Sequence, residues 1–243
     1  MMTPFARGAF LVVALLLCLV REARSAQAPG DSTVYHLAPI SRLVVKTGKA
    51  GLFGFAGHTH VIRARAVSGE LVYHPGRPAS YLRLRAPTDS LEVLTPPDTA
   101  EIRKVTEAMR TDVLHVDKYP EMTFAADALN ARDGKMELQL AITMEGTTRR
   151  VPVTANVAIR PDTIRATGTF VAKQTDFGIQ PFRGGPGGTV KVADQVTFCF
   201  DLVAIRGPSG EADASQAQHA DPAAVPGCVD KPVQRTEDGR RPM

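Results

Sequence analysis

Two histidines, His58 and His60, are separated by one residue, and their type and spacing suggest chemistry more directly than any other residues in the chain. In a β-strand, residues i and i+2 point to the same face, so both imidazoles can reach one metal ion. A third ligand would have to come from His36, His74 or His115. The pair can instead hydrogen-bond the polar head of a ligand, or serve as structural or surface histidines. The sequence leaves these roles open.

Other motifs that resemble catalytic signatures lack essential parts. Asp176-Phe177-Gly178 and the segment 203–206 resemble protein-kinase fragments, but their order is reversed and no catalytic-loop motif accompanies them. The Gly-rich run at 184–188 is not followed by the Lys-Ser/Thr of a phosphate-binding loop. No Gly-x-Ser-x-Gly motif occurs, and the carboxylates show no pairing suited to acid–base catalysis. We therefore expect a protein that is not an enzyme.

The elements that would position any site are β-strands, and the pattern is clearest between Ile164 and Arg206. In two long segments of this region, apolar residues such as Phe170, Phe198 and Phe200 alternate with polar ones. A period of two indicates a strand with one buried face and one wet face. Similar segments earlier in the chain, including a regular hairpin over 138–159, bring the expected total to about nine or ten strands.

One segment has a helical pattern instead. Asp98 and Glu101 form a capping box, and Ile102, Val105 and Met109 build one apolar stripe. A single helix among many strands favours an antiparallel barrel over alternating strands and helices. We therefore predict an all-β fold, an extended antiparallel β-barrel with one helical insertion near residues 98–114.

Several stretches resemble one protein family. The segments Phe170–Ile179 and Val190–Val196 resemble the C-terminal signature of the YceI-like family of polyisoprenoid-binding proteins. Ala108–Phe124, Leu140–Val153 and Val34–Ser41 resemble further segments of the family, in the family's order. The resemblance implies an extended, lipocalin-like barrel that is exported in bacteria and holds a long isoprenoid or similar lipid inside.

An eight-stranded barrel can hold one ligand if side chains do not fill its interior. An apolar wall would stabilise an isoprenoid-type lipid, a quinone or a polyisoprenoid, by about 0.8 kcal/mol per buried CH₂. No further cofactor is expected. The alternative is a filled core, as in an interaction or stress protein of the periplasm. The candidate lining residues are Leu82, Leu84, Leu138, Leu140, Ile142, Met144, Val151, Val153, Phe170, Phe198 and Phe200.

The termini suggest export and a tail. Residues 1–28 have the basic start, short apolar run and small residues of a signal peptide, with cleavage after Ser25 or Ala28. The barrel would occupy 29–206, and the small, polar residues of 207–243 predict disorder. An exported protein can hold a disulfide, so Cys199 and Cys228 are either bridged or unpaired.

The net charge of +4 is too small to predict nucleic-acid binding. It is compatible with transient contact with an anionic membrane surface, and equally with an ordinary solvated surface rich in Arg. The sequence leaves open whether the protein forms a homodimer.

Overall fold

The computed structural model describes residues 33–49, 59–74, 80–94, 99–184, 188, 190–207 and 225. The chain divides into two units, Met1–Asp31 and Ser32–Met243. The first unit lies outside the described residues, and so do the predicted signal peptide and its cleavage sites.

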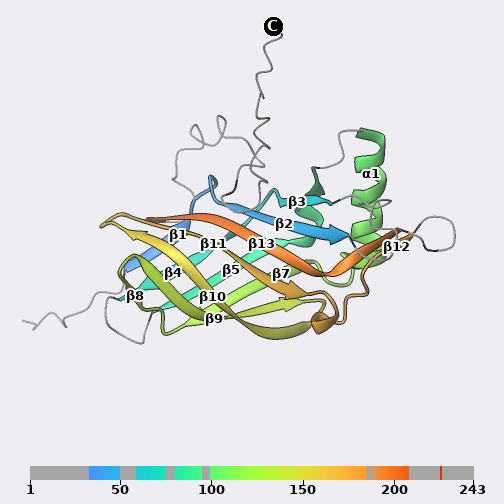
Figure 1. Ribbon diagram of the computed structural model, residues 1–243. Coiled ribbons are helices and arrows are strands. Elements are labelled where there is room, and N and C mark those ends of the chain that lie inside the picture. Colours follow the sequence, from blue (N-terminus) through green and yellow to red (C-terminus); the bar gives the residue numbers. More distant parts are fainter. Residues whose placement is uncertain are drawn as a thin grey trace, which may run out of the picture. The chain divides into compact units, whose positions relative to one another are not determined.

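The described part of the second unit is built mainly of strands (Figure 1). The strands are β1 Thr33–Leu37, β2 Arg42–Lys49, β3 Val61–Ala64, β4 Ser68–Tyr73, β5 Tyr81–Pro87, β6 Leu91–Val93, β7 Glu121–Asp127, β8 Ala131–Arg132, β9 Lys135–Met144, β10 Thr147–Ile159, β11 Thr163–Lys173, β12 Arg183–Gly184 and β13 Val190–Arg206. The helical elements are α1 Thr99–Ala108 and the short turns η2 Thr88–Ser90, η3 Met109–Val113 and η4 Thr175–Phe177.

Eight strands close into an antiparallel barrel in the order β1, β4, β5, β7, β9, β10, β11, β13 and back to β1. The closing strand, β13, is 17 residues long, which lets it serve two partners in succession. Its middle pairs with β2, and its last residues pair with β1, as in Tyr35↔Arg206. From β2 the sheet continues outward through β3 to β6. The predicted all-β, lipocalin-like barrel is confirmed.

The predicted helix is also present. It begins at Thr99 and continues after Ala108 into η3, a turn of π-helix, so the helical region falls within the expected 98–114. The stripe residue Met109 is buried, and Val105 packs against the same core. Asp98, the predicted cap, lies outside the described residues. Among the described residues, none of the helices has both the length and the apolar character needed to cross a membrane.

The predicted hairpin over 138–159 forms from β9 and β10. Its turn is Glu145-Gly146, and both residues have a positive φ, 46° and 72°, as a two-residue turn of this kind requires. Pro152 pairs with Gln139 of β9, whereas the register between β10 and β11 covers only Asn156–Ile159. In the described part of the chain, β10 therefore has no second strand partner at Pro152. A proline has no N–H to donate, and it is tolerated at such an edge position.

The C-terminal signature forms a corner between β11 and β13. Asp194 accepts hydrogen bonds from the backbone N–H of Thr175, at 2.9 Å, and from its hydroxyl, at 2.8 Å. The backbone N–H of Gln174 donates to the carbonyl of Asp194 at 2.9 Å. Phe177 is buried below this corner, and Gly178 ends the turn with a φ of 83°. The signature is thus explained by the way the chain turns at the end of the barrel.

Replacing Asp194 with Ala should destabilise this corner. The backbone N–H of Thr175 lowers the pKa of the Asp194 carboxyl below its usual value. A lowered pKa stabilises the fold above the unfolded value of about 4, and this contribution is lost as the pH falls through the folded value. We expect Asp194→Ala to lower the free energy of unfolding by about 1 kcal/mol at pH 7, as for a lost capping side chain. Chemical denaturation should show the difference shrinking in acid.

The control for this measurement is Asp176→Ala, because Asp176 is exposed within the same turn. Its effect should stay within about 0.5 kcal/mol. An Asp194→Ala effect that is equally small, or that grows as the pH falls, would contradict the capping role.

On the outer face of β13, the side chain of Cys199 is fully buried. Cys199 is disulfide-bonded, so the alternative that leaves it unpaired is wrong. The chain has two other cysteines, Cys18 and Cys228, and both lie outside the described residues. Val225 packs with Val44 against Cys199 and is fully buried. Apart from Gly207 and Val225, the tail predicted to be disordered lies outside the described residues, and its disorder stays a prediction.

Candidate functional site

The barrel interior contains an apolar cavity. Its volume is about 90 Å³, which is small for a cavity bounded by so many side chains. The cavity is therefore a narrow slot rather than a wide chamber. It is bounded by Leu37, Leu43, Val67, Gly69, Glu70, Leu71, Leu82, Leu84, Phe124, Leu129, Met136, Leu138, Leu140, Val153, Ala155, Val157, Ile164, Ala166, Phe170, Phe200, Leu202 and Ala204.

Glu70 is the only charged residue among those that line the slot. Its carboxylate accepts a hydrogen bond of 3.0 Å from the hydroxyl of Tyr81, and this bond raises the pKa of Tyr81. Tyr81 alternates with the lining residues Leu82 and Leu84, so its side chain and that of Glu70 lie on the outer face. The inner wall formed by the described residues accordingly offers contact to hydrocarbon and no group for acid–base or nucleophilic chemistry.

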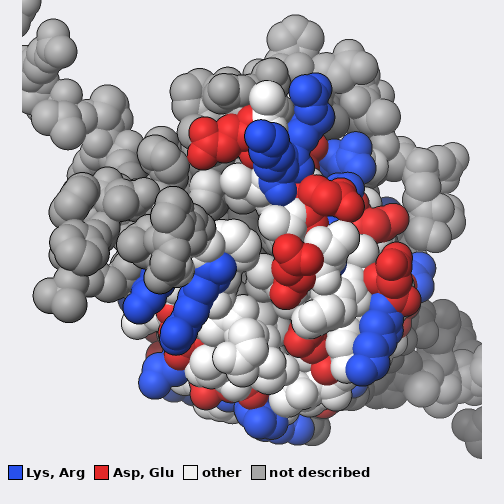
Figure 2. Space-filling view, turned by 90° about the vertical axis from the view of Figure 1, so that its right-hand side faces the viewer, with Lys and Arg blue, Asp and Glu red and all other residues white. Residues whose placement is uncertain are grey.

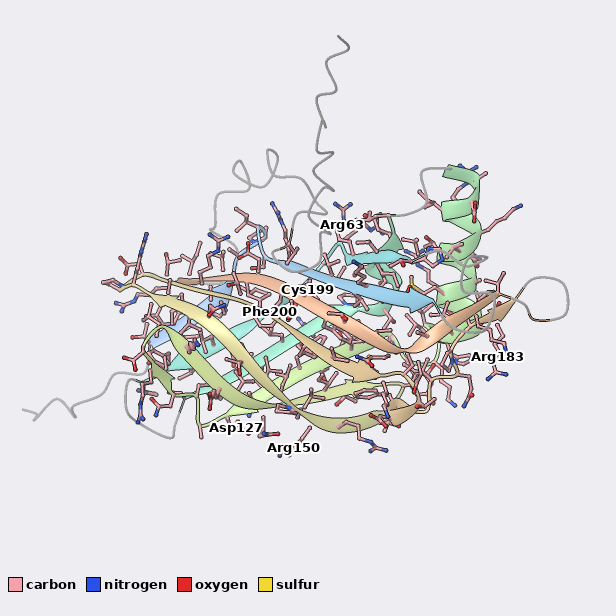
Figure 3. All side chains as sticks on the ribbon, in the orientation of Figure 1. Arg63, Asp127, Arg150, Arg183, Cys199 and Phe200 are labelled. Atoms are coloured by element: carbon pink, nitrogen blue, oxygen red, sulfur yellow. The ribbon has the colours of Figure 1, made fainter. Side chains whose placement is uncertain are left out.

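The structure brings seven of the eleven predicted lining residues together on this slot. They are Leu82, Leu84, Leu138, Leu140, Val153, Phe170 and Phe200. They come from β5, β9, β10, β11 and β13, and the closed ring of strands turns their inner faces toward one another. Figure 3 shows Phe200 within the barrel, whereas Arg63, Asp127 and Arg150 project outward. Contact of these seven with a ligand stays a prediction.

The other four predicted residues do not line the slot. Ile142, Met144 and Phe198 are buried in the core, and Val151 packs against it. Ile142 is 0% exposed and Phe198 is 2% exposed. Alternation had placed all four correctly on the inner face. It could not show that this layer of the barrel is filled.

Sequence reasoning also missed part of the wall. Leu71 and Leu202 continue the inner parity of strands that the pattern had identified, so extending the alternation would have found them. Ala155, Ala166 and Ala204 carry no strong signal as lining residues, because a small apolar side chain is equally common in a packed core. Their small size leaves part of the slot empty.

A second cavity lies beneath α1. It has a volume of about 440 Å³ and shares none of its described lining residues with the slot. Its wall combines apolar side chains with a few charged ones from α1 and β13. It is bounded by Thr47, His60, Ile62, Val93, Glu101, Lys104, Val105, Ala108, Met109, Val113, Gln174, Phe182, Val190, Lys191 and Val192.

The histidines do not form a metal site among the described residues. His60 lines the second cavity, and its backbone exchanges hydrogen bonds with Thr47. His58 lies outside the described residues, so the metal role of the pair stays a prediction. In the described ranges, no group of three or more His, Cys, Asp or Glu side chains is placed to hold a metal ion.

The three candidates for a third ligand lie on other elements. The Nδ1 atom of His115 lies 2.7 Å from Oε1 of Glu145, within hydrogen-bond distance, in an open polar cleft. His36 pairs along β1 with Glu70 and Ile205. The backbone N–H of His74 donates to the hydroxyl of Ser80.

Charges of both signs are interspersed on the face shown in Figure 2, with uncharged surface between them. One strong pair joins β11 to β13, where the guanidinium of Arg165 donates to both oxygens of Asp201 at 2.8 and 2.6 Å. This contact raises the pKa of Arg165. Such mixing provides no single-sign field on this face of the kind that steers nucleic acid.

Comparison with known proteins agrees with this geometry. The YceI-like domain family matches residues 40–204. A polyisoprenoid-binding domain from Saccharophagus degradans is similar in structure, with a TM-score of 0.55 and 13% identity over 73% of this chain and 100% of that one. BcnA from Burkholderia cenocepacia has a TM-score of 0.53 and 18% identity over 68% of this chain and 98% of that one. These similarities support the fold. Among curated proteins, none matches the chain.

Proposed function

The chain belongs to the YceI-like family, and on that premise we propose that it binds an isoprenoid-type lipid by enclosing the tail in the barrel. The observation that carries this proposal is the slot, whose described wall presents only apolar side chains inside a closed ring of eight strands. Each CH₂ group moved from water into such a wall contributes about 0.8 kcal/mol. Affinity therefore needs no catalytic group.

The narrowness of the slot favours a single unbranched or methyl-branched chain over a bulky ring system. A quinone or phosphate head would remain at the mouth, because the described inner wall has no polar side chain to replace the water that such a head would lose. The protein then acts as a carrier or store for the tail and not as an enzyme. The structural neighbour from Saccharophagus degradans is a polyisoprenoid-binding domain, which is consistent with this ligand class.

We place this activity outside the cytoplasm. Residues 1–28 have the pattern of a signal peptide, and the disulfide-bonded state of Cys199 suits an oxidising compartment. Loading and release would require transient contact with a membrane surface, because lipid tails are stored there.

Native mass spectrometry of the exported protein, followed by organic extraction, tests the proposal. We expect a retained mass that partitions into solvent and proves to be an isoprenoid or acyl lipid. In addition, purified protein should take up added farnesol. A protein that carries no lipid and does not take up farnesol would overturn the proposal, and a mass that leaves only with a chelator would support the metal alternative.

A matched pair of substitutions in β11 locates the ligand. Ala166 lines the slot, whereas Val171 lies on the outer face and is 44% exposed. Ala166→Trp should fill the slot and reduce farnesol uptake at least about tenfold, since a loss of two buried CH₂ groups already suffices for that change. Val171→Trp should leave uptake unchanged.

The natural chain has no Trp, so each variant carries a single indole. Its fluorescence should be blue-shifted in Ala166→Trp and close to that of exposed Trp in Val171→Trp, which verifies folding and placement. Equal uptake by the two folded variants would show that the lipid does not occupy the slot.

A further inference from the structure

The slot and the second cavity follow one another along three neighbouring strands. On β2, Leu43 lines the slot, Thr47 lines the second cavity, and Val45 between them lines neither. These three residues share one face of the strand, because they are two positions apart. A single layer of side chains therefore separates the two cavities on this wall.

The neighbouring strands repeat this order. On β13, the inner residue Phe200 lines the slot and Val192 lines the second cavity, while Val196 and Phe198 are buried between them. On β11 and its continuation, Phe170 lines the slot and Gln174 lines the second cavity. Phe198 pairs with Val45 of β2 on one side and with Phe170 of β11 on the other. These three residues therefore lie side by side across the three strands.

Phe198 is the centre of this separating layer. Its ring stacks on Phe170, with centroids 4.8 Å apart and planes inclined by 6°. It also meets the edge of Phe124, with centroids 6.3 Å apart and planes inclined by 73°. Both of these partners line the slot. The Phe198 ring therefore lies directly behind the wall at that end of the slot.

Strands β7, β9 and β10 contribute further inner residues that line neither cavity. Met122, Ile142 and Met144 are buried on β7 and β9, and Val151 of β10 packs against the same core. Ile142, Met144, Val151 and Phe198 are the four residues that alternation had assigned to the lining and that line neither cavity.

Beyond the layer, the second cavity is able to accept more hydrocarbon. Ile62, Val93 and Met109 give it an apolar side, while Lys104 and Lys191 place amines on its wall. A tail that passed the layer would meet the apolar side of this cavity.

We propose that Phe198 limits the length of the lipid tail that the barrel accepts. The inference rests on the proposed function, since it concerns the same slot. In the natural protein, the tail ends against the layer centred on Phe198, so any additional isoprene unit remains outside the slot. Removal of the ring joins the slot to the second cavity, and the protein then gains affinity for longer chains.

The test compares Phe198→Leu and Phe198→Ala with Phe200→Leu. Phe200 is the next inner position of the same strand, and it forms the wall of the slot rather than the layer behind it. Each protein is incubated with an equimolar mixture of geraniol, farnesol, geranylgeraniol and geranylfarnesol. Native mass spectrometry then gives the ratio of longer to shorter bound alcohols. A ratio within one sample does not depend on the fraction of protein that is folded.

For the natural protein, we expect the ratio of each bound alcohol to the next shorter one to favour the longer alcohol only up to one chain length. In the Phe198 variants, the next longer alcohol should gain at least about tenfold over the shorter one, since a newly buried isoprene unit contributes several CH₂ groups. Phe200→Leu should change total binding without moving the chain length at which the ratio stops rising. Phe198→Leu provides a milder truncation if the Ala variant does not fold.

Three results are distinguishable. If the natural protein binds none of the alcohols, the proposed function fails. If it binds them and its ratio rises through the longest alcohol, the tail already passes Phe198 and the length limit is overturned while the function stands. If the natural protein shows a limit that the Phe198 variants keep, another part of the barrel sets it, and the inference is again overturned.

Discussion

Phe177→Ala is expected to lower the free energy of unfolding by about 3–5 kcal/mol, as for a large aromatic side chain removed from a core. Phe177 is 1% exposed and lies in η4, which contacts both β10 and β11. The register between these strands covers only Asn156–Ile159, and the remainder of β10 faces this turn without a ladder to β11. Elsewhere in the barrel, neighbouring strands are held together by backbone hydrogen bonds. At this end of β10 and β11, packing of the Phe177 ring takes that role.

Urea denaturation followed by circular dichroism measures this effect. A loss of this size is a large part of the usual stability of a domain, about 5–15 kcal/mol, so the midpoint should move markedly. Val171→Ala is the control, because Val171 is an exposed apolar residue of the adjacent strand, and its effect should stay within about 0.5 kcal/mol. An equal, small effect of both changes would show that the corner does not support the barrel.

Gly69→Ala is expected to destabilise the barrel by at least about 3 kcal/mol, because it combines backbone strain with a collision. Gly69 has a φ of 151°, and a Cβ there would lie 2.2 Å from the carbonyl oxygen of Arg83 and 2.8 Å from the Cα of Leu84. These are main-chain atoms of β5, which pairs with β4 at this position. They cannot rotate away, so the two strands would have to separate beside the slot.

Gly178→Ala is the matched control for that change. Gly178 also has a positive φ, 83°, but no atom lies within 4 Å of the position its Cβ would take. Only the conformational cost remains, about 1–2 kcal/mol. In thermal unfolding, the melting temperature of Gly69→Ala should therefore be well below that of Gly178→Ala. The reverse order would indicate that β4 and β5 are not packed as closely as described.

Much of the fold was predictable because strand alternation and helix periodicity are local. The two long segments that contain Phe170 and Phe198 form β11 and β13, and the stripe that includes Met109 forms the helical insertion. The family resemblance, carried by segments such as Phe170–Ile179, is confirmed by the family match over 40–204. Local patterns could not show that β13 changes partner from β2 to β1, because this depends on strands separated by more than a hundred residues.

The site was predictable only in part. Alternation placed Leu140 and Ile142 on the same inner face, yet Leu140 lines the slot while Ile142 is buried in the layer beside it. A period of two specifies the face of a strand and not the depth along the barrel. Whether a given depth is empty depends on the combined volume of side chains from all the strands that meet there.

By itself, the sequence therefore determined most of the strands, their inner faces, the helix α1 and the family, although it predicted nine or ten strands where the described residues form thirteen. The tertiary structure alone decided where the interior is open, since the slot and the filled layer beside it contain residues of the same apolar types. Phe198 stacks on Phe170 only because β11 and β13 pair in that register. The register aligns side chains into layers, and the volume of each layer determines whether it is packed or can hold a ligand.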